Sequence, residues 1–219
     1  MMKSVLISIR PQWVEKIARG EKTIEVRNSA PKEVPFKCYI YETKGQYVEF
    51  THGAHTKYGY GRGKVIGEFI CDKVEDFYCA SVPYQRKNNL GYGQFIDNGV
   101  YKVNGWHEGI VFERNDRYID TMLNNNDLKE MCLSAQELFD YIGIGKHLYG
   151  LHISDLKIYD KPRELSEFRK PLDRVWGSYC NDYCDAECIY YCKDYRDWEK
   201  GLIRPPQSWQ YVEEVEQTI

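Results

Sequence analysis

The stretch that decides the fold is Gly20-Glu21-Lys22-Thr23-Ile24-Glu25-Val26-Arg27. Its second half alternates polar and apolar residues, which predicts a strand with Ile24 and Val26 on one side. Glu25 and Arg27 would then share the opposite side of that strand. Gly20 is expected to end a preceding helix, because glycine tolerates the left-handed conformation at a helix end. This helix-to-strand junction is therefore the first place to look for a functional site.

A strand and a helix are predicted before this stretch. Residues 5–9 form a short apolar run rich in β-branched residues, which is typical of a buried strand. Pro11 stands where the first helical turn tolerates proline, and apolar residues at helical spacing follow it up to Gly20. Further strands are predicted over four segments, at 36–43, 64–74, 147–159 and 209–215. We therefore expect an α+β fold.

This order of elements resembles the ASCH domain, a branch of the PUA-like superfamily. The matching segments are Ile7-Ser8-Ile9-Arg10-Pro11-Gln12-Trp13, the Gly20 to Arg27 stretch, Cys38 to Thr43, Gly63 to Phe69, and Tyr149 to Ile153. Together they cover about two thirds of the chain. The resemblance implies a small mixed β-barrel of five or six strands with flanking helices and a cleft beside the first helix. It also implies binding of RNA or modified nucleosides.

Two segments are predicted to interrupt this barrel domain, which is expected to span residues 1–160. Residues 45–63 are rich in Gly, Tyr and His, and residues 78–121 are polar and rich in turn signals. Both are expected to be loop insertions, the first of them flexible. A Cys-rich excursion is predicted over 161–203. Residues 204–219 are then expected to return to the barrel as a strand.

The charged residues of the central stretch are the first candidates for ligand binding. Lys22 is expected to overhang the barrel mouth, because it follows the helix-ending glycine directly. A lysine desolvated in a cleft has a lowered pKa and can act as a nucleophile or base, whereas a charged lysine donates to phosphate or carbonyl groups. Glu25 and Arg27 would read the donor and acceptor edge of a base. In an alternative interpretation they pair with each other on a solvated strand face.

The first functional hypothesis is a binding module for RNA, a nucleotide or a modified nucleoside. Arg10 is placed to contact a phosphate, and Trp209 ends a stiff loop from which it would stack a base. Trp209 would otherwise be a buried side chain in a rigid turn. The predicted ligand-binding residues are Arg10, Lys22, Glu25, Arg27, Glu68 and Trp209.

The second hypothesis is an enzyme, either a nucleoside amidohydrolase that removes an acyl group from N4-acylcytidine-like substrates or a ribonuclease. The resemblance implies a catalytic lysine with an acidic partner, for which Glu130 is the nearest candidate and Glu68 a second option. Amidohydrolase-like members have threonine at the third position after this lysine, where this chain has Glu25. The predicted catalytic residues are Lys22, Thr23, Glu25 and Glu130. A third hypothesis is a partner-binding role for the insertions and the Cys-rich excursion.

Four cysteines of the excursion recur every four residues, namely Cys180, Cys184, Cys188 and Cys192. On one straight helix the first and last would stand about 18 Å apart at ~1.5 Å rise per residue. One tetrahedral zinc cannot bridge that span, so the chain would have to break or fold back. We expect a structural zinc site held by these cysteines. Four reduced, partly buried thiols are the main alternative, and an iron–sulfur cluster is a weaker one, because the spacing matches no established cluster motif.

Composition limits the partners and the compartment. The chain has 219 residues, a net charge of −3 and a pI near 6.0, which is not the basic footprint of a protein that coats duplex nucleic acid. The first apolar run ends at Arg10 and is too short for a secretory signal, and no segment approaches a membrane span. We therefore expect a cytoplasmic protein with reduced thiols and no membrane partner. The oligomeric state is left open.

Overall fold

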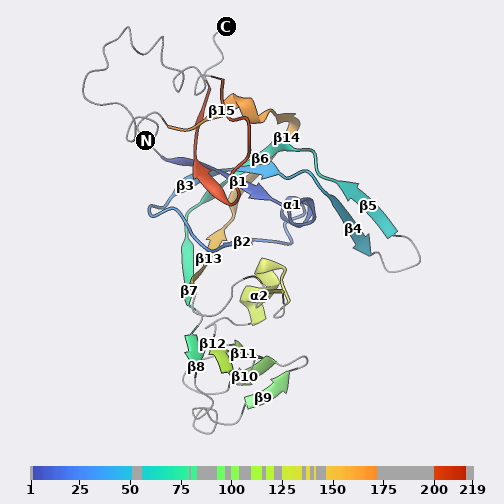
Figure 1. Cartoon of the computed structure of the whole chain (residues 1–219), viewed down its shortest axis with the longest axis vertical. Helices are drawn as coiled ribbons and strands as arrows, with labels where there is room; N and C mark the ends of the chain where they lie inside the picture. The colour runs from blue at the N-terminus through green and yellow to red at the C-terminus, as the bar shows by residue number, and fades with distance from the viewer. Residues whose placement is uncertain are drawn as a thin grey trace. The chain divides into compact units, whose positions relative to one another are not determined.

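The computed structural model describes residues 2–50, 56–78, 80–82, 93–96, 100–103, 110–114, 117–120, 125–134, 137–138, 141, 147–171 and 200–215. The chain divides into two compact units. Unit 1 comprises residues 1–18, 35–70 and 155–219, and unit 2 comprises residues 19–34 and 71–154. Strands dominate the described residues and helices are few (Figure 1), which confirms the predicted α+β class in its coarse form.

Unit 1 is built on a five-stranded sheet with the strand order β14-β6-β3-β1-β16 (Figure 1). Its strands are β1 (Ser4–Ile9), β3 (Phe36–Glu42), β6 (Lys64–Cys71), β14 (Ser154–Arg163) and β16 (Trp209–Tyr211). β1 runs parallel to β3 and antiparallel to β16. Val5, Leu6 and Ile7 are fully buried, as predicted for this apolar run.

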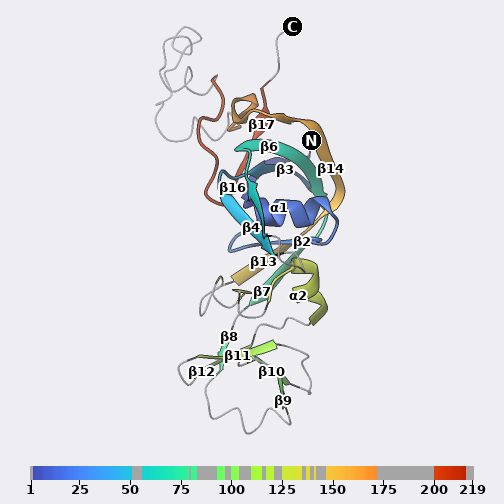
Figure 2. The same cartoon turned by 90° about the vertical axis from the view of Figure 1, so that its right-hand side faces the viewer.

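A helix and a small second sheet complete unit 1. Helix α1 (Pro11–Ala18) begins where Trp13 and Val14 donate their backbone N–H groups to the Arg10 carbonyl. It buries Val14 and Ile17 and lies beside β3 (Figure 2), which confirms the predicted helix. After the 3₁₀ turn η2 (Leu165–Glu167), β15 (Phe168–Arg169) pairs with β17 (Glu213–Glu214).

The prediction of a flexible loop over residues 45–63 is wrong. β4 (Gln46–Phe50) and β5 (Thr56–Tyr60) pair there as antiparallel strands (Figure 1). Their Tyr, Val, Phe and Thr residues favour extended backbone, and this outweighs the glycines. Gly61 lies so close to the backbone that a Cβ atom would stand 1.8 Å from the Thr43 carbonyl oxygen, so only glycine fits.

Unit 2 contains an antiparallel three-stranded sheet with the order β2-β13-β7. Its strands are β2 (Ile24–Arg27), β7 (Val74–Tyr78) and β13 (His147–His152), and helix α2 (Asn125–Met131) lies beside β2. The packing is tight at Gly150, where a Cβ atom would meet Phe77 at 2.9 Å and Ile24 at 3.0 Å.

The second predicted loop insertion, residues 78–121, also contains strands. A five-stranded antiparallel sheet of unit 2 has the order β8-β12-β11-β10-β9. Its strands are β8 (Ala80–Val82), β9 (Gly93–Ile96), β10 (Val100–Val103), β11 (Ile110–Arg114) and β12 (Arg117–Asp120). β-branched and aromatic residues recur in these short segments and favour strands, despite the polar composition of the whole insertion.

Two strands that were predicted to be continuous are each divided. The segment 64–74 separates into β6 and β7, and the segment 147–159 separates into β13 and β14. The second division falls at Ile153, and close to it, near the start of β14, Asp155 has a positive φ of 47°. Both divisions fall at borders between unit 1 and unit 2. The strands belong to separate sheets, and closure into one barrel is not confirmed.

The four cysteines of the predicted zinc site, Cys180, Cys184, Cys188 and Cys192, lie outside the described residues, so the zinc stays a prediction. Within the described ranges, Cys38, Cys71 and Cys132 are free thiols. In that same part of the chain, no group of three or more His, Cys, Asp or Glu side chains could hold a metal ion. None of the helices found there is long and apolar enough to cross a membrane.

Candidate functional site

Three charged side chains of unit 2, which lie on β2 and just before it, are buried together. The exposed fractions are 3% for Lys22, 3% for Glu25 and 8% for Arg27. The expectation that Lys22 overhangs an open mouth is therefore wrong. The alternation of polar and apolar residues suggested that one face of β2 is solvated. In the structure all four residues of β2 are buried. We call these three residues the buried charge cluster.

Glu25 lies between the two cations of the buried charge cluster. Its Oε1 atom accepts a hydrogen bond from the Arg27 guanidinium, and its Oε2 atom lies 3.6 Å from Lys22 Nζ. Lys22 Nζ also donates to the Met131 carbonyl oxygen at 2.6 Å, and Arg27 donates to the Val26 carbonyl at 2.9 Å. Glu25 and Arg27 thus pair with each other, as the alternative interpretation held, but they do so in the interior.

The electrostatics of the buried charge cluster are set by the loss of water. Burial lowers the pKa of Lys22 below its ordinary value, and the nearby negative charge of Glu25 acts in the opposite direction. Glu25 Oε2 is buried and accepts no hydrogen bond within the described part of the chain. A buried carboxylate oxygen without a hydrogen bond costs free energy of folding. A hydrogen-bond donor placed at this atom would therefore be favourable.

The backbone around Thr23 fixes the buried charge cluster to its neighbours. The Thr23 N–H donates to the Glu130 carbonyl of α2 at 2.9 Å, and the Thr23 carbonyl accepts from the Ile153 N–H at 2.9 Å. The segment before β2 is thereby joined to both α2 and the end of β13. The Thr23 side chain is exposed, while its neighbours Lys22 and Ile24 are buried.

The predicted catalytic set is only partly brought together. Lys22 and Glu25 are adjacent, whereas Thr23 points to solvent. Glu130 reaches this segment through its backbone carbonyl, and its carboxylate accepts a hydrogen bond from the Asn126 side chain at 2.8 Å.

The other predicted ligand-binding residues, Arg10, Glu68 and Trp209, belong to unit 1, whereas the buried charge cluster belongs to unit 2. Arg10 is exposed and its carbonyl accepts the first hydrogen bonds of α1. Trp209 is half-buried on β16, and its ring packs edge-on against Tyr211 with 5.4 Å between centroids. Glu68 accepts hydrogen bonds from Lys37 and Tyr159, at 3.5 Å and 2.6 Å.

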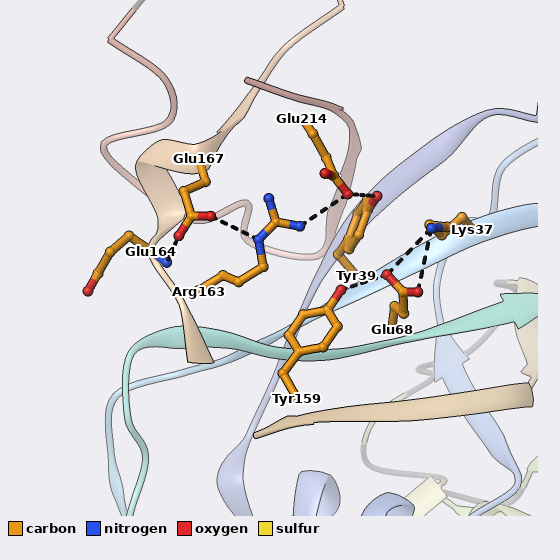
Figure 3. A network of polar contacts seen from close by, with 8 residues as sticks. All are labelled: Lys37, Tyr39, Glu68, Tyr159, Arg163, Glu164, Glu167 and Glu214. Atoms are coloured by element: carbon orange, nitrogen blue, oxygen red, sulfur yellow. Dashed lines mark hydrogen bonds and ion pairs between the residues drawn. The ribbon is translucent and has the colours of Figure 1, made fainter. Parts of the chain in front are cut away.

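Glu68 is part of a polar network in unit 1, which we call the carboxylate network (Figure 3). Its members are Lys37, Tyr39, Glu68, Tyr159, Arg163, Glu164, Glu167 and Glu214. Glu214 accepts a hydrogen bond from the Tyr39 hydroxyl and lies 3.1 Å from the Arg163 guanidinium. Arg163 Nε also donates to Glu167 at 2.9 Å. Side chains from β3, β6, β14 and β17 are thereby tied together.

The carboxylate network shifts the titration of its members. Burial raises the pKa of Tyr39, and its hydrogen bond to Glu214 acts in the same direction. Tyr159 behaves in the same way, with Glu68 as its partner. Burial alone would raise the pKa of Glu214, but hydrogen bonds from Tyr39 and Arg163 outweigh it and lower that pKa. These shifts describe groups that stabilise one another.

Sequence reasoning missed several polar residues on β7 and β13. His152 Nε2 lies 3.3 Å from Glu75 Oε2, and His147 Nδ1 lies 2.8 Å from Asp76 Oδ1. Tyr149 stands between the two histidines on β13. The partners are about seventy residues apart in the chain, so no local motif could have revealed them. Only the β13–β7 register brings them together.

No family model matches the chain, and no curated protein matches it. Among solved structures, the chain is similar to the ASCH protein from Zymomonas mobilis and to two point mutants of it. For the two mutants, the identity is 15% and the TM-scores are 0.46 and 0.45. The matches cover 96% of this chain and 89% or 91% of the other. The unaltered protein matches with 14% identity, a TM-score of 0.44, and 96% and 88% coverage. These similarities to the ASCH protein of Zymomonas mobilis are similarities of structure, at 15% sequence identity or less.

Proposed function

We propose that unit 2 binds a nucleotide, a modified nucleoside or an RNA base through the buried charge cluster. The observation that carries this proposal is the buried Glu25 Oε2 atom, which accepts no hydrogen bond within the described residues. A ligand N–H group would satisfy it. Lys22 Nζ lies 3.6 Å away and would donate to a neighbouring carbonyl of the same ligand.

This pairing of donor and acceptor suits the edge of a nucleobase. Pyrimidines and purines present N–H and C=O or ring-nitrogen groups side by side on one edge, and Glu25 and Lys22 offer an acceptor beside a donor. Arg27 holds the other oxygen of Glu25 and so fixes the direction of the free acceptor. Burial would strengthen each such hydrogen bond and would penalise a ligand that lacks one partner.

The second candidate function is a nucleoside amidohydrolase. The observation in its favour is the lowered pKa of Lys22, because a desolvated lysine has more of the neutral amine needed for nucleophilic or base catalysis. The Thr23 side chain is exposed, and the Glu130 carboxylate accepts a hydrogen bond from Asn126. The acidic partner of Lys22 in this proposal is therefore Glu25, which lies beside it. Ribonuclease activity would draw on the same two residues.

One experiment separates these proposals. The protein is incubated with a nucleoside and nucleotide panel that includes acylated cytidine, and mass spectrometry then follows both the products and the retained material. Retention without turnover supports the binding module, and release of the acyl group supports the amidohydrolase. Failure to retain or convert any member of the panel would contradict both.

The variant that tests the site is Lys22→Met, which keeps the length of the side chain but removes its donor. We expect it to abolish retention or turnover. The matched control is Lys37→Met, which removes a lysine of the carboxylate network in unit 1. Thermal unfolding of both variants shows whether a loss of binding reflects a loss of folding. Equal ligand retention by Lys22→Met and wild type would contradict the assignment of the site.

A further inference from the structure

The sheet face that carries Glu25 and Arg27 continues across β13 and β7. In the register of unit 2, Arg27 lies opposite Tyr149, and Tyr149 lies opposite Asp76. Glu25 lies opposite Leu151 on the same side. Residues directly opposite each other in antiparallel strands share a face and stand about 5 Å apart at Cβ. Tyr149 is therefore the immediate neighbour of Arg27 on this face.

Exposure increases along this row from β2 to β7. Arg27 is 8% exposed, Tyr149 is half-buried, and the Asp76 side chain is 49% exposed. On the opposite face of the same sheet, Gly150 packs closely against Phe77 and Ile24. A ligand that reaches Arg27 and Glu25 on this face from β7 therefore meets Tyr149 first.

Tyr149 is one half of an ordered aromatic pair. The rings of His147 and Tyr149 are nearly parallel, with an angle of 15° between their planes and 6.0 Å between their centroids. His147 is held by Asp76, whose carboxylate oxygens lie 2.8 and 3.1 Å from Nδ1. An aromatic surface whose orientation is fixed in advance loses little entropy when a flat ring stacks on it.

We infer that Tyr149, together with His147 and its Asp76 anchor, forms a stacking platform for the ring of a nucleobase. The inference rests on the proposed function, in which the buried charge cluster contacts the edge of the same base. Tyr149 lies directly opposite Arg27 and diagonal to Glu25, a separation of about 7–8 Å that one base ring spans. The ligand class is thus a planar heteroaromatic ring with an N–H group on its edge.

The test compares Tyr149→Leu with Tyr149→Phe. The probes are the four ribonucleoside 5′-monophosphates and ribose 5-phosphate, which has no base. We expect Tyr149→Leu to weaken the tightest nucleotide by about tenfold to a hundredfold, whereas Tyr149→Phe retains wild-type affinity, because stacking needs the ring and not the hydroxyl. Affinity for ribose 5-phosphate should not change. The control is Tyr60→Leu, which removes a highly exposed tyrosine of unit 1 and should leave binding unchanged.

A second readout distinguishes stacking from a structural effect. In NMR spectra, base protons that stack on an aromatic ring shift upfield, and this shift should disappear in Tyr149→Leu and persist in Tyr149→Phe. Equal nucleotide affinity in wild type and Tyr149→Leu would overturn the platform while leaving the proposed function intact. A parallel loss of ribose 5-phosphate binding would also overturn it. If wild-type protein binds no nucleotide at all, the proposed function fails and the platform fails with it.

Discussion

The buried charge cluster of unit 2 and the carboxylate network of unit 1 use similar residues in different surroundings. In the carboxylate network, Glu68 and Glu214 each accept hydrogen bonds from a tyrosine and lie near a cation, and both are partly exposed. In the buried charge cluster, Glu25 is 3% exposed and one of its oxygens accepts no hydrogen bond within the described residues. Satisfied charges at a surface suit a stabilising role, whereas a buried and incompletely satisfied carboxylate suits a binding site.

The largest expected effect is the loss of Glu25. In Glu25→Gln, the buried Lys22 and Arg27 lose the carboxylate that they share, and removal of one partner from a buried ion pair costs about 3–5 kcal/mol. The equivalent change in the carboxylate network, Glu68→Gln, should cost clearly less, because that side chain is 20% exposed. Urea denaturation of both variants at neutral pH measures the difference. Equal losses of unfolding free energy in Glu25→Gln and Glu68→Gln would contradict the distinction between the buried charge cluster and the carboxylate network.

The pH dependence of Glu25→Gln sharpens this test. Burial already lowers the pKa of Lys22, and loss of the Glu25 charge should lower it further. The unfolded chain then binds more protons than the folded protein between the folded pKa of Lys22 and its ordinary value of 10.5, so stability rises with pH across that interval. We therefore expect the stability deficit of Glu25→Gln to shrink as pH rises. A deficit that is independent of pH would show that Lys22 does not titrate differently in the two states.

The second largest effect is expected at Tyr159. Tyr159→Phe removes a hydrogen bond to the Glu68 carboxylate, which should cost about 1–2 kcal/mol at neutral pH. In wild type the raised pKa of Tyr159 keeps the folded hydroxyl protonated while the unfolded one ionises above its ordinary value of 10.0, so stability falls as pH rises past that value. The fall should be shallower in Tyr159→Phe. Denaturation curves recorded between neutral pH and pH values above the ordinary tyrosine pKa would show it, and identical slopes would contradict the raised pKa.

A smaller effect is expected at Glu214. Glu214→Gln should cost about 1 kcal/mol at neutral pH, because solvent screens a carboxylate whose side chain is 45% exposed. The lowered pKa of Glu214 means that its stabilisation is present above its ordinary value of 4.5 and is lost as pH falls through the folded value. Acid titration of stability should therefore be flatter in Glu214→Gln than in wild type. A steeper loss of stability with falling pH in Glu214→Gln would contradict the lowered pKa of Glu214.

The smallest effect is expected at Asp76. Asp76→Asn removes the charge that faces His147, but both side chains are 49% exposed, and such pairs contribute about 0–0.5 kcal/mol. Thermal unfolding of Asp76→Asn should thus match wild type closely. A loss as large as that of Glu25→Gln would mean that this part of unit 2 is structural, and it would weaken the case for a ligand platform on β13.

The fold was predictable where a local pattern determines the structure. The apolar run of β1, the proline at the start of α1 and the glycine after it are each sufficient to place their element. Residues 45–63 were not predictable in the same way, because their glycines suggested a loop and pairing between β4 and β5 decided the outcome. The breaks between β6 and β7 and between β13 and β14 fall close to the borders of the two units, which no local pattern reveals.

The candidate site was predictable in its members and not in its environment. The stretch from Gly20 to Arg27 identified Lys22, Glu25 and Arg27, and the structure brings them together. Alternation suggested a solvated face, but tertiary packing buries both faces of β2. Tyr149 and Asp76 were missed, because their relation to Arg27 is a matter of strand register across distant segments. The separate zinc prediction at Cys180 to Cys192 lies outside the described residues and remains to be tested by elemental analysis.

The position of β16 has a consequence for synthesis. β1 is synthesised long before β16, and β16 pairs with one of its two edges. Until β16 has been synthesised, that edge of a largely apolar strand has no partner and can pair with another nascent chain. A protein shortened before Trp209 would keep the edge open permanently, and we expect it to be recovered in inclusion bodies.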